Sequence, residues 1–401
     1  MDFTSIKDMD LNGKTVLLRA DLNVPAQNAR VTDTTRIDRL KPTIDYLRQA
    51  GAKVLVLSHF GRPDGEQNPQ MSLAFLVSAL QDSWGVVVKF APDCVGDAAK
   101  KVADSLSPGD VALLENLRFH KGEEANDPHF SAKLADLGDV YVNDAFSAAH
   151  RAHASTEGIT HLLPSAAGLL MEQELNALSR ALEAPEKPVM AIAGGSKIST
   201  KLNVLLNLVK KVDYLVLGGG MANTFLFAEG ATVGGSLCEK DMAHEAQDIM
   251  KAADKAGCRI ILPCDAICVE NLAPDAPFEI YDTQEIPADR RAIDIGPKSI
   301  NEITEIMGSC KTLVWNGPMG VFEIKPFDNG TNALAKTAAE LTKTGNLVSV
   351  AGGGDTVAAL ENAGVRDDFT YISTAGGAFL EWLEGKTLPG VAALLAARKT
   401  D

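Results

Sequence analysis

The stretch VMAIAGGSKISTKLNVLLNLVKK, residues 189–211, shows the unit from which this chain is built. A short apolar run, typical of a buried strand, ends in two glycines, and a segment with apolar residues at helical spacing follows. Apolar runs also end in glycines in YLVLGGGMA (214–222), LVSVAGGGDT (347–356) and YISTAGGAF (371–379), and TLVWNGPMG (312–320) ends in Asn-Gly. Strands that alternate with helices indicate an α/β protein with parallel sheets.

The first half of the chain contains the same kind of apolar run, but there the runs end in charged and polar side chains. They are VLLRADLN (16–23), VLVLSHFGR (54–62), VALLENLRF (111–119) and VYVNDAF (140–146). Open parallel sheets bind ligands just beyond the carboxyl ends of their strands. The two kinds of ending therefore predict two binding edges, one built from side chains and one from backbone, for two different anionic ligands.

The length of 401 residues exceeds one ordinary core, so we predict two domains, each a doubly wound, Rossmann-like parallel sheet. Between the two kinds of strand ending lies a helical segment, LLMEQELNALSRALEAPEKP (169–188), which Pro185 and Pro188 end. We interpret it as the interdomain connector. The predicted domains are residues 1–169 and 170–388, and the second begins with this helix.

Composition excludes several classes of protein. The net charge of −15 argues against a nucleic-acid-binding or acidic-membrane-binding surface. The first residues have no apolar signal core, and no apolar run approaches the ~20 residues of a membrane span, so we expect a cytoplasmic protein. The six cysteines form no CxxC pair, which predicts reduced thiols and neither disulfides nor a zinc site.

Two lysines follow the glycines of the 189–211 stretch. With Ser196 as the N-cap of the following helix, Lys197 and Lys201 would share one face of its first turns. Like charges at this spacing repel each other, and cations are unfavourable at the positive end of a helix dipole. Two solvated surface lysines are one interpretation. An anion held by the glycine loop, with both ammonium groups offsetting its charge, explains the pattern better.

Cationic side chains also cluster at the strand ends of the first half. Arg36 lies in the opening turn of the predicted helix TRIDRLKPTIDYLRQ (35–49), again at the end that disfavours a cation. Others lie just past strand ends, namely His59, Arg62, Arg118 and Arg151. Arginine recognises phosphate and carboxylate with two parallel hydrogen bonds, so the cluster predicts an anion site.

Polar residues near this cluster have two interpretations. Asp21 and Asn23, at the end of the first apolar run, suit hydrogen bonds to a ligand hydroxyl, or they cap a turn. We interpret His153 and His161 as structural.

The segment AGGGDT (351–356) combines a glycine nest with Asp355 and Thr356 at a helix start. An ordinary N-cap is one interpretation of Asp355. The glycines favour a second, in which a phosphate chain approaches the backbone and Asp355 holds Mg²⁺. The chain has no GxxxxGK[ST] motif, and GxGxxG fails because Asn223 and Val357 stand where the third glycine belongs. A P-loop protein and a dinucleotide-binding enzyme are both disfavoured.

The chain resembles phosphoglycerate kinase in segments that follow the family's order over essentially all 401 residues: RADLNVP, SHFGRP, LLENLRF, NDAFSAAHRAHAS, GGSKISTK, VWNGPMGVFE and AGGGDT. The resemblance implies two domains that face each other across a hinged cleft, with segment 389–401 returning to the first. We expect the hinge in the helix from about Leu169 to Leu182 and in the turns near Pro389.

The resemblance also implies an activity. This is the glycolytic and gluconeogenic reaction, reversible transfer of a phosphoryl group between 1,3-bisphosphoglycerate and Mg-ADP, which gives 3-phosphoglycerate and Mg-ATP. Transfer would be direct and in line, after domain closure, in a monomeric enzyme.

Residue by residue, the resemblance assigns three groups. The phosphoglycerate site comprises Asp21, Asn23, Arg36, His59, Arg62, Arg118 and Arg151. The nucleotide site comprises Gly194, Lys197, Lys201, Gly218, Gly219, Asn316, Pro318, Glu323, Gly353, Gly354, Asp355 and Thr356, with Glu323 on the ribose and Asp355 on Mg²⁺. The residues around the transferring group are Arg36, Lys197, Lys201, Gly353, Gly354, Gly376 and Gly377. Ser147 stands where the family often has glycine, so we leave it out of the site.

Two other functions remain as alternatives. A non-catalytic two-domain protein that binds a phosphorylated metabolite would explain the cationic cluster but not the glycine-rich edge or the paired lysines. An NAD-dependent dehydrogenase with variant glycine motifs is the second alternative.

Overall fold

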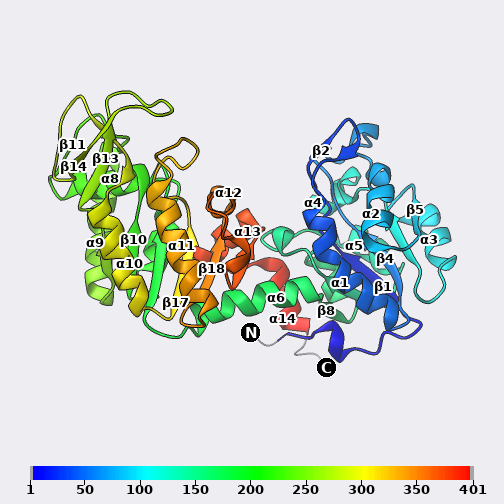
Figure 1. The fold of residues 1–401 in the computed structure, drawn as a ribbon. Coiled ribbons are helices and arrows are strands. Elements are labelled where there is room, and N and C mark those ends of the chain that lie inside the picture. The colour runs from blue at the N-terminus through cyan, green and yellow to red at the C-terminus, as the bar shows by residue number, and fades with distance from the viewer. Residues whose placement is uncertain (1–2, 398–401) are drawn as a thin grey trace. The chain divides into compact units, whose positions relative to one another are not determined.

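The computed structural model describes residues 3–397, which form two compact units (Figure 1). Unit 1 comprises Met1–Asn176 and Thr387–Asp401, and unit 2 comprises Ala177–Lys386. We had placed the first boundary at residues 169 and 170, but the division falls inside helix α6 (Leu169–Leu178). The reason is packing, because Leu169 and Leu170 at the start of this helix contact the core of unit 1.

The core of unit 1 is a six-stranded sheet in the order β5-β6-β4-β1-β7-β8, and every pair of neighbours is parallel. Its strands are β1 (Thr15–Arg19), β4 (Lys53–Leu57), β5 (Val88–Ala91), β6 (Val111–Leu114), β7 (Val140–Asn143) and β8 (Ser165–Ala167). Alternate residues of β1 enter two separate cores, Val16 and Leu18 in one and Leu17 in the other. Both faces of the sheet are therefore covered, as in a doubly wound fold.

The helices of unit 1 cover these two faces. They are α1 (Thr35–Gln49), α2 (Val77–Trp84), α3 (Gly96–Asp104), α4 (Lys121–Glu124), α5 (Pro128–Ala135), α6 and α14 (Pro389–Ala397). A small hairpin, β2 (Ala26–Gln27) and β3 (Arg30–Val31), precedes α1. In α14 the amide of Gly390 donates to the carbonyl of Ala149 at 2.9 Å, so the described part of the predicted returning segment contacts unit 1. Residues 398–401 of that segment lie outside the described residues.

Unit 2 is built on a second six-stranded parallel sheet, in the order β12-β10-β9-β17-β18-β19. Its strands are β9 (Val189–Ala193), β10 (Tyr214–Leu217), β12 (Arg259–Ile261), β17 (Thr312–Asn316), β18 (Val348–Gly352) and β19 (Tyr371–Ser373). Counted along the chain, these strands have the order 3-2-1-4-5-6 of dinucleotide-binding folds, whereas the order in unit 1 is 3-4-2-1-5-6. All nine apolar runs identified in the sequence are strands of these two sheets, so the predicted fold class is confirmed.

The helices of unit 2 are α7 (Leu202–Leu208), α8 (Gly219–Ala228), α9 (Ala243–Ala256), α10 (Pro297–Ser309), α11 (Asn329–Lys343), α12 (Gly354–Asn362) and α13 (Gly376–Leu383). Buried residues of β9, β17, α10 and α11 form one continuous apolar core, which includes Met190, Trp315, Ile303 and Leu334. Among residues 3–397, no helix combines the length and the apolar character that crossing a bilayer requires.

A second, antiparallel sheet in unit 2 was not foreseen. It has the order β14-β13-β16 and consists of β13 (Asp265–Val269), β14 (Phe278–Asp282) and β16 (Arg291–Ile295). A two-stranded parallel pair, β11 (Thr232–Val233) and β15 (Glu285–Ile286), accompanies it. The sequence of β14, FEIYD, alternates apolar and polar residues, but its Phe278 and Ile280 are exposed, so the alternation does not mark a buried face.

The predicted connector helix is confirmed as a helix. After α6, Ser179–Glu183 continues as a π-helical turn. Its role as a hinge remains a prediction.

Candidate active site

Both predicted sites lie where the chain reverses its strand order. In unit 1 the strands on either side of this point are β1 and β7, and in unit 2 they are β9 and β17. Loops that leave the carboxyl ends of two such neighbouring strands diverge and leave room for a ligand. The predicted site residues follow these strands and their neighbours β4 and β6 in unit 1 and β10, β18 and β19 in unit 2.

In unit 1, Asp21 after β1 organises one group of side chains. Its Oδ2 accepts hydrogen bonds from Nη1 of Arg36 at 2.8 Å and from Oγ of Ser147 at 2.5 Å. The same Nη1 of Arg36 donates to the carbonyl of Asn23 at 3.0 Å. Ser147 follows β7, so its bond crosses the point where the strand order reverses. We had left Ser147 out of the site, although its position after a strand end, like that of Asp21, was the signal that could have included it.

A glycine loop joins three more of the predicted residues. The amide of Gly61 donates to Oδ1 of Asn23 at 3.0 Å, and its carbonyl accepts from Nη1 of Arg118 at 2.8 Å. Arg62, the next residue, is exposed. The backbone of Gly61 has φ +62°, a conformation that glycine adopts without strain. One short turn thus holds Asn23 and Arg118, and Arg62 is the next residue of this turn.

A buried arginine that the sequence analysis missed supports this cluster. Arg19, the last residue of β1, is 1% exposed, and its Nε donates to Oγ of Ser155 at 2.9 Å. Its Nη2 lies 3.0 Å from Nδ1 of His59. Because a guanidinium can only donate, Nδ1 of His59 accepts and the imidazole is neutral. The arginine interrupts an otherwise apolar run, and that interruption was the signal.

The field of the arginines sets the protonation of two histidines. Burial lowers the pKa of His59 well below its usual range, and Arg19, Arg118 and Arg151 lower it further. Burial also lowers the pKa of His153 to about 4, with smaller contributions from the same arginines. Both histidines therefore lie in the cationic cluster as neutral groups.

We had interpreted His153 as structural, and that interpretation did not foresee that His153 lies within the cationic cluster. His161 is exposed, and its Nε2 lies 2.5 Å from Oε1 of Glu157.

The buried carboxylate of Glu123 partly balances the positive charge of the cluster. This carboxylate is fully buried and accepts from the amide and the hydroxyl of Ser155, at 3.0 and 2.6 Å. Ser155 thereby connects Glu123 to Arg19. Burial raises the pKa of Glu123, and Arg19 opposes this shift. Arg151, half-buried, donates from Nε to the ring of His150 at 3.2 Å.

In unit 2, Lys201 occupies the corresponding position. Its Nζ donates to the carbonyl of Gly194 at 2.7 Å, to that of Asn316 at 3.1 Å and to Oδ1 of Asn316 at 2.7 Å. Gly194 follows β9 and Asn316 ends β17, so the ammonium group joins the two strands at the reversal. Burial lowers the pKa of Lys201 to about 8, and the nearby carboxylate of Asp355 opposes the shift.

The predicted helix start at Ser196 is wrong. Helix α7 begins at Leu202 with Lys201 as its N-cap, and residues 194–201 form a loop. The cause is the half-buried ammonium group of Lys201, whose hydrogen bonds hold the loop against the strand ends. Lys197 is exposed and does not share a helix face with Lys201, so the argument from repulsion on one face does not apply.

Two of the predicted nucleotide-site glycines are required by packing within the protein. A Cβ atom on Gly194 would lie 1.8 Å from the carbonyl oxygen of Pro318, and one on Gly218 would lie 2.8 Å from Cα of Met319. The amide of Gly219 also donates to the carbonyl of Met319 at 2.9 Å. These glycines let the loop after β17 lie directly on the neighbouring strand ends.

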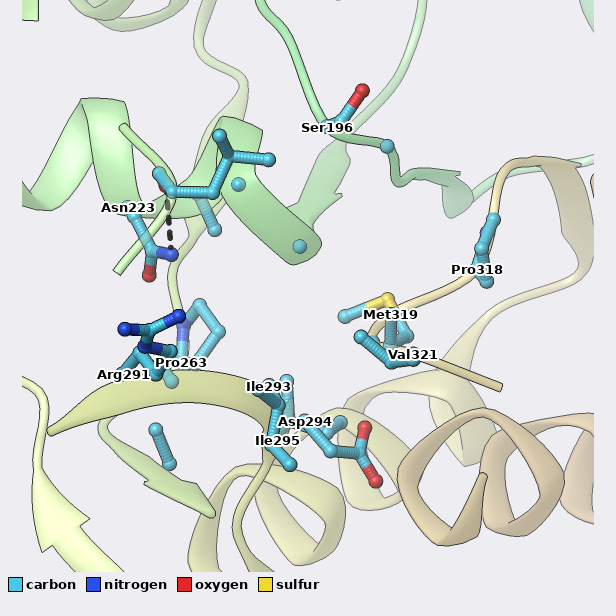
Figure 2. A pocket seen from close by; sticks show the side chains of 18 of the residues that line it. Ser196, Asn223, Pro263, Arg291, Ile293, Asp294, Ile295, Pro318, Met319 and Val321 are labelled. Carbon is cyan, nitrogen blue, oxygen red and sulfur yellow. Dashed lines mark hydrogen bonds between the residues drawn. The ribbon is translucent and has the colours of Figure 1, made fainter. Parts of the chain in front are cut away.

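Beside this loop is a cavity of about 570 Å³, shown in Figure 2. Three residues of the predicted adenosine pocket line this cavity, namely Gly219, Pro318 and Glu323. Gly194 and Gly218 do not line it, but they pack against Pro318 and Met319, which do. The antiparallel sheet supplies its opposite wall through β16. Its lining is largely apolar and includes Ile293, Ile295, Met319, Val321 and Phe322.

Asp355 lies at the edge of the same cavity, in the first turn of α12. The N-cap of this helix is Gly353, at φ +99°, so the interpretation of Asp355 as an N-cap is wrong. Its carboxylate is exposed. Thr356 is buried, and its Oγ1 accepts from the amide of Gly317 at 2.7 Å. The two neighbours thus differ, because Asp355 faces solvent and Thr356 holds the loop.

Two predicted glycines have no steric reason to be glycine. A Cβ atom on Gly354 or Gly376, the first residues of α12 and α13, would meet no atom within 4 Å. Neither residue has a positive φ. Bare backbone at these helix N-termini leaves their amides open to an anion. Gly377 is the second residue of α13 and is exposed.

One group of three metal-type donors occurs among residues 3–397, formed by Asp93, Cys94 and His120 in unit 1. Oδ1 of Asp93 accepts from the amide of Cys94 at 2.7 Å and lies 2.7 Å from Nε2 of His120. That separation is a hydrogen bond. Two ligands on one metal ion, each about 2 Å from it, would lie farther apart.

The comparisons with known proteins agree with this geometry. The family model described as phosphoglycerate kinase matches residues 6–386. The chain belongs to the phosphoglycerate kinase family. It is 59% identical over 394 residues to the phosphoglycerate kinase of Rhodospirillum centenum, covering 98% of this chain and 100% of that one. It is 56% identical over 397 residues to that of Zymomonas mobilis, covering 99% and 100%.

Solved structures show the same fold. Phosphoglycerate kinase from Coxiella burnetii superposes with a TM-score of 0.93 at 41% identity, covering 98% of this chain and 99% of that chain. The enzyme from Pyrococcus horikoshii gives 0.82 at 30% identity, covering 99% and 100%. Identity at this level over the whole chain supports a kinase that carries out the glycolytic phosphoryl transfer, and it does not favour the non-catalytic binding protein.

Proposed function

We propose that the protein transfers the acyl phosphate of 1,3-bisphosphoglycerate to Mg-ADP, reversibly, with unit 1 holding the phosphoglycerate and unit 2 the nucleotide. One observation supports this division. At the same topological point, unit 1 has a cluster of cationic side chains and unit 2 has a glycine-lined cavity. Each site suits an anion, and the second also has a largely apolar cavity of about 570 Å³, which is large enough for a nucleoside.

In unit 1 the ligand would be recognised by its charges and by its hydroxyl group. Arg36, Arg62, Arg118 and Arg151 supply planar donors for phosphate and carboxylate. Asp21 and Asn23 supply acceptors for a hydroxyl. His59 fits this site as a neutral imidazole, because Arg19 occupies its Nδ1 and leaves Nε2 to donate.

In unit 2 the nucleotide would enter with its base in the apolar cavity and its phosphates at the helix starts. Glu323 lies on the cavity wall, where we place the ribose. Lys197, Lys201 and the amides of Gly353, Gly354, Gly376 and Gly377 would neutralise the phosphate chain.

Asp355 fits the role of Mg²⁺ ligand, because an exposed carboxylate beside a phosphate site is what this ion requires. When bound, Mg²⁺ would offset the negative charge of the phosphates.

The chemistry needs no nucleophile from the protein. Phosphoryl transfer depends on in-line positioning and on neutralisation of charge, and the attacking oxygen already belongs to a phosphate or carboxylate. Since Arg36 belongs to unit 1 and Lys197 and Lys201 to unit 2, transfer requires domain closure. We expect small-angle scattering to show a larger fall in the radius of gyration with both ligands than the two single falls combined. An unchanged radius would overturn closure.

A coupled assay tests the function itself. Purified protein should consume ATP only when 3-phosphoglycerate and Mg²⁺ are both present, and EDTA should stop the reaction. Binding of ATP without turnover would favour the non-catalytic alternative. We also expect a monomer in the cytoplasm, and sedimentation and cell fractionation test these two expectations.

A further inference from the structure

Glu123 is a fully buried carboxylate to which the proposed reaction gives no direct role. It lies in α4, labelled in Figure 1, and none of its surface is exposed. Burying an ionised carboxylate costs free energy unless its oxygens accept hydrogen bonds and a positive charge lies nearby. Both oxygens accept from Ser155. Burial raises the pKa of Glu123, and among the charges that oppose this rise that of Arg19 has the largest effect.

The hydrogen bonds that begin at Glu123 have a fixed direction. An ionised carboxylate can only accept, so the hydroxyl proton of Ser155 points to Oε1 of Glu123, at 2.6 Å. A lone pair of the same Oγ faces Nε of Arg19, which donates to it at 2.9 Å. Nη2 of Arg19 lies 3.0 Å from Nδ1 of His59 and donates to it, so the ring proton of His59 is on Nε2. These four residues form what we call the Glu123 network, which runs from a buried charge to the proposed phosphoglycerate site.

Further contacts hold the members of this network in place. The hydroxyl of Tyr141 donates to the carbonyl of Ser155 at 2.7 Å, and the amide of Ala154 donates to the carbonyl of Glu123 at 3.0 Å. Ser155 and Arg19 are 0% and 1% exposed. Water therefore does not compete for these hydrogen bonds, and bonds in such surroundings are stronger than exposed ones.

We propose that Glu123 is a positioning residue for the phosphoglycerate site. Through Ser155 it holds Arg19, and Arg19 holds His59 with Nε2 left to donate to an anionic oxygen of the ligand. This inference rests on the proposed function of unit 1. A donor that is oriented before the ligand arrives does not have to be ordered during binding, which favours affinity.

Ser155→Ala tests the proposal because it removes the link and keeps the charge of Glu123. We expect KM for 3-phosphoglycerate to rise about tenfold and KM for ATP to stay at the wild-type value. Tyr141→Phe is the matched control, since it removes another buried hydroxyl that contacts Ser155 but leaves the Glu123 network intact. It should keep the wild-type KM. Equal rises in Ser155→Ala and Tyr141→Phe would mean that packing around Ser155 is the cause, and the proposal would fail.

Glu123→Gln tests the carboxylate itself. One terminal atom of the side chain becomes an NH2 group, which can only donate. The amide of Ser155 also only donates, so the NH2 group must face Oγ of Ser155, where the hydroxyl proton now points. Loss of the negative charge alone would make the cluster more cationic and lower KM for an anion. We expect KM for 3-phosphoglycerate to rise about tenfold instead, and a lower or unchanged KM in the folded variant would overturn the positioning role.

A double-mutant cycle shows whether Glu123 acts through His59. His59→Ala should itself raise KM for 3-phosphoglycerate, and adding Glu123→Gln should then change it by less than about twofold. Full additivity of the two effects would contradict the network.

Nitrogen-15 NMR of the wild-type protein gives a test that needs no variant. At neutral pH the ring of His59 should be neutral, with its proton on Nε2 and with Nδ1 as an acceptor. A proton on Nδ1 would refute the network even in an active enzyme. Wild-type protein that consumes no ATP with 3-phosphoglycerate would instead refute the proposed function.

Discussion

The two units join the strand ends at their topological reversal points with different groups. In unit 1 the ends of β1 and β7 are joined by side chains, with Ser147 donating to Asp21, and the proposed anion site is rich in arginines. In unit 2 the ends of β9 and β17 are joined by an ammonium group and by backbone, and glycines let the loops touch. A small, highly charged ligand is recognised by fixed charges. A nucleotide needs an apolar cavity and close backbone approach to its phosphates, which glycine permits.

Because of this difference, mutations in the two units should have different effects on stability. An arginine of unit 1 is replaceable without loss of the fold when it is partly exposed, since exposed ion pairs contribute about 0–1 kcal/mol to stability. Gly194 of unit 2 is not replaceable, because a Cβ atom there would lie 1.8 Å from the carbonyl oxygen of Pro318. Substitutions in unit 1 should therefore affect catalysis, and those at packed glycines of unit 2 should affect folding.

The largest effect should come from Arg36. We expect Arg36→Ala to lower kcat by about 10²–10⁴-fold, because the charge acts chiefly in the transition state. Thermal unfolding should be close to wild type, since the side chain is 34% exposed and its partner Asp21 keeps the bond from Ser147. Arg36→Lys is the matched control, which keeps the charge without the planar fork. An unchanged kcat in folded Arg36→Ala would remove this residue from the mechanism.

Asp355→Asn should weaken the binding of one ligand and leave the binding of the other unchanged. Loss of one charged contact of about 1.5–3 kcal/mol predicts roughly 10–100-fold weaker Mg-nucleotide binding. The affinity for 3-phosphoglycerate should not change, because we propose its site in unit 1, away from Asp355. Calorimetric titration with each ligand alone measures both. Equal losses for the two ligands would contradict the assignment of Asp355 to the metal.

Two glycine variants distinguish packing from ligand binding within unit 2. Gly194→Ala sets a Cβ against the carbonyl of Pro318 and should destabilise the protein by about 1–3 kcal/mol or more. Gly354→Ala meets no atom, so it should unfold like wild type while its nucleotide affinity falls by about tenfold. Denaturant unfolding and nucleotide titration give the two readouts. If nucleotide affinity stays normal in Gly354→Ala, ligand approach is not the reason for this glycine.

The pH dependence of nucleotide binding should report on Lys201. Its pKa of about 8 lies below the usual 10.5, so the ammonium loses its proton as the pH rises through about 8. We expect nucleotide affinity to fall several-fold between pH 7 and pH 9, and Lys201→Arg should abolish this step because arginine stays charged. The unfolded chain binds this proton more tightly, so Lys201 should make the free energy of unfolding rise from about pH 8 to 10.5. A flat affinity profile in the wild type would contradict the burial of this charge.

The smallest effect should come from Ser147. Its hydroxyl occupies Oδ2 of Asp21, an acceptor that we assign to the substrate hydroxyl. Ser147→Ala should therefore lower KM for 3-phosphoglycerate by about two- to threefold, the scale of a weak hydrogen bond. Nucleotide KM should not change. A higher KM for 3-phosphoglycerate would mean that Ser147 positions Asp21 for the substrate and does not compete with it.

The sequence by itself determined the fold class and predicted the division of the ligands between the two units. Nine apolar runs with characteristic endings located nine strands, because an apolar run followed by glycine or a charge is a local pattern. It also brought the arginines to one edge, since the carboxyl ends of parallel strands must meet. The antiparallel sheet was missed, although β14 (FEIYD) alternates apolar and polar residues; its exposed Phe278 and Ile280 show that this alternation does not mark a buried face.

Tertiary structure decided the features that depend on contacts between residues far apart in the sequence. Ser196 looked like a helix cap, but the burial of Lys201 against β17, 115 residues later in the chain, turns that segment into a loop. Gly194 looked like a nucleotide contact, but the carbonyl that requires it belongs to Pro318. Arg19 and Ser147 entered the site through partners more than 100 residues away. Hydrogen bonds and steric contacts over such separations form only in the folded chain, because folding brings these residues together.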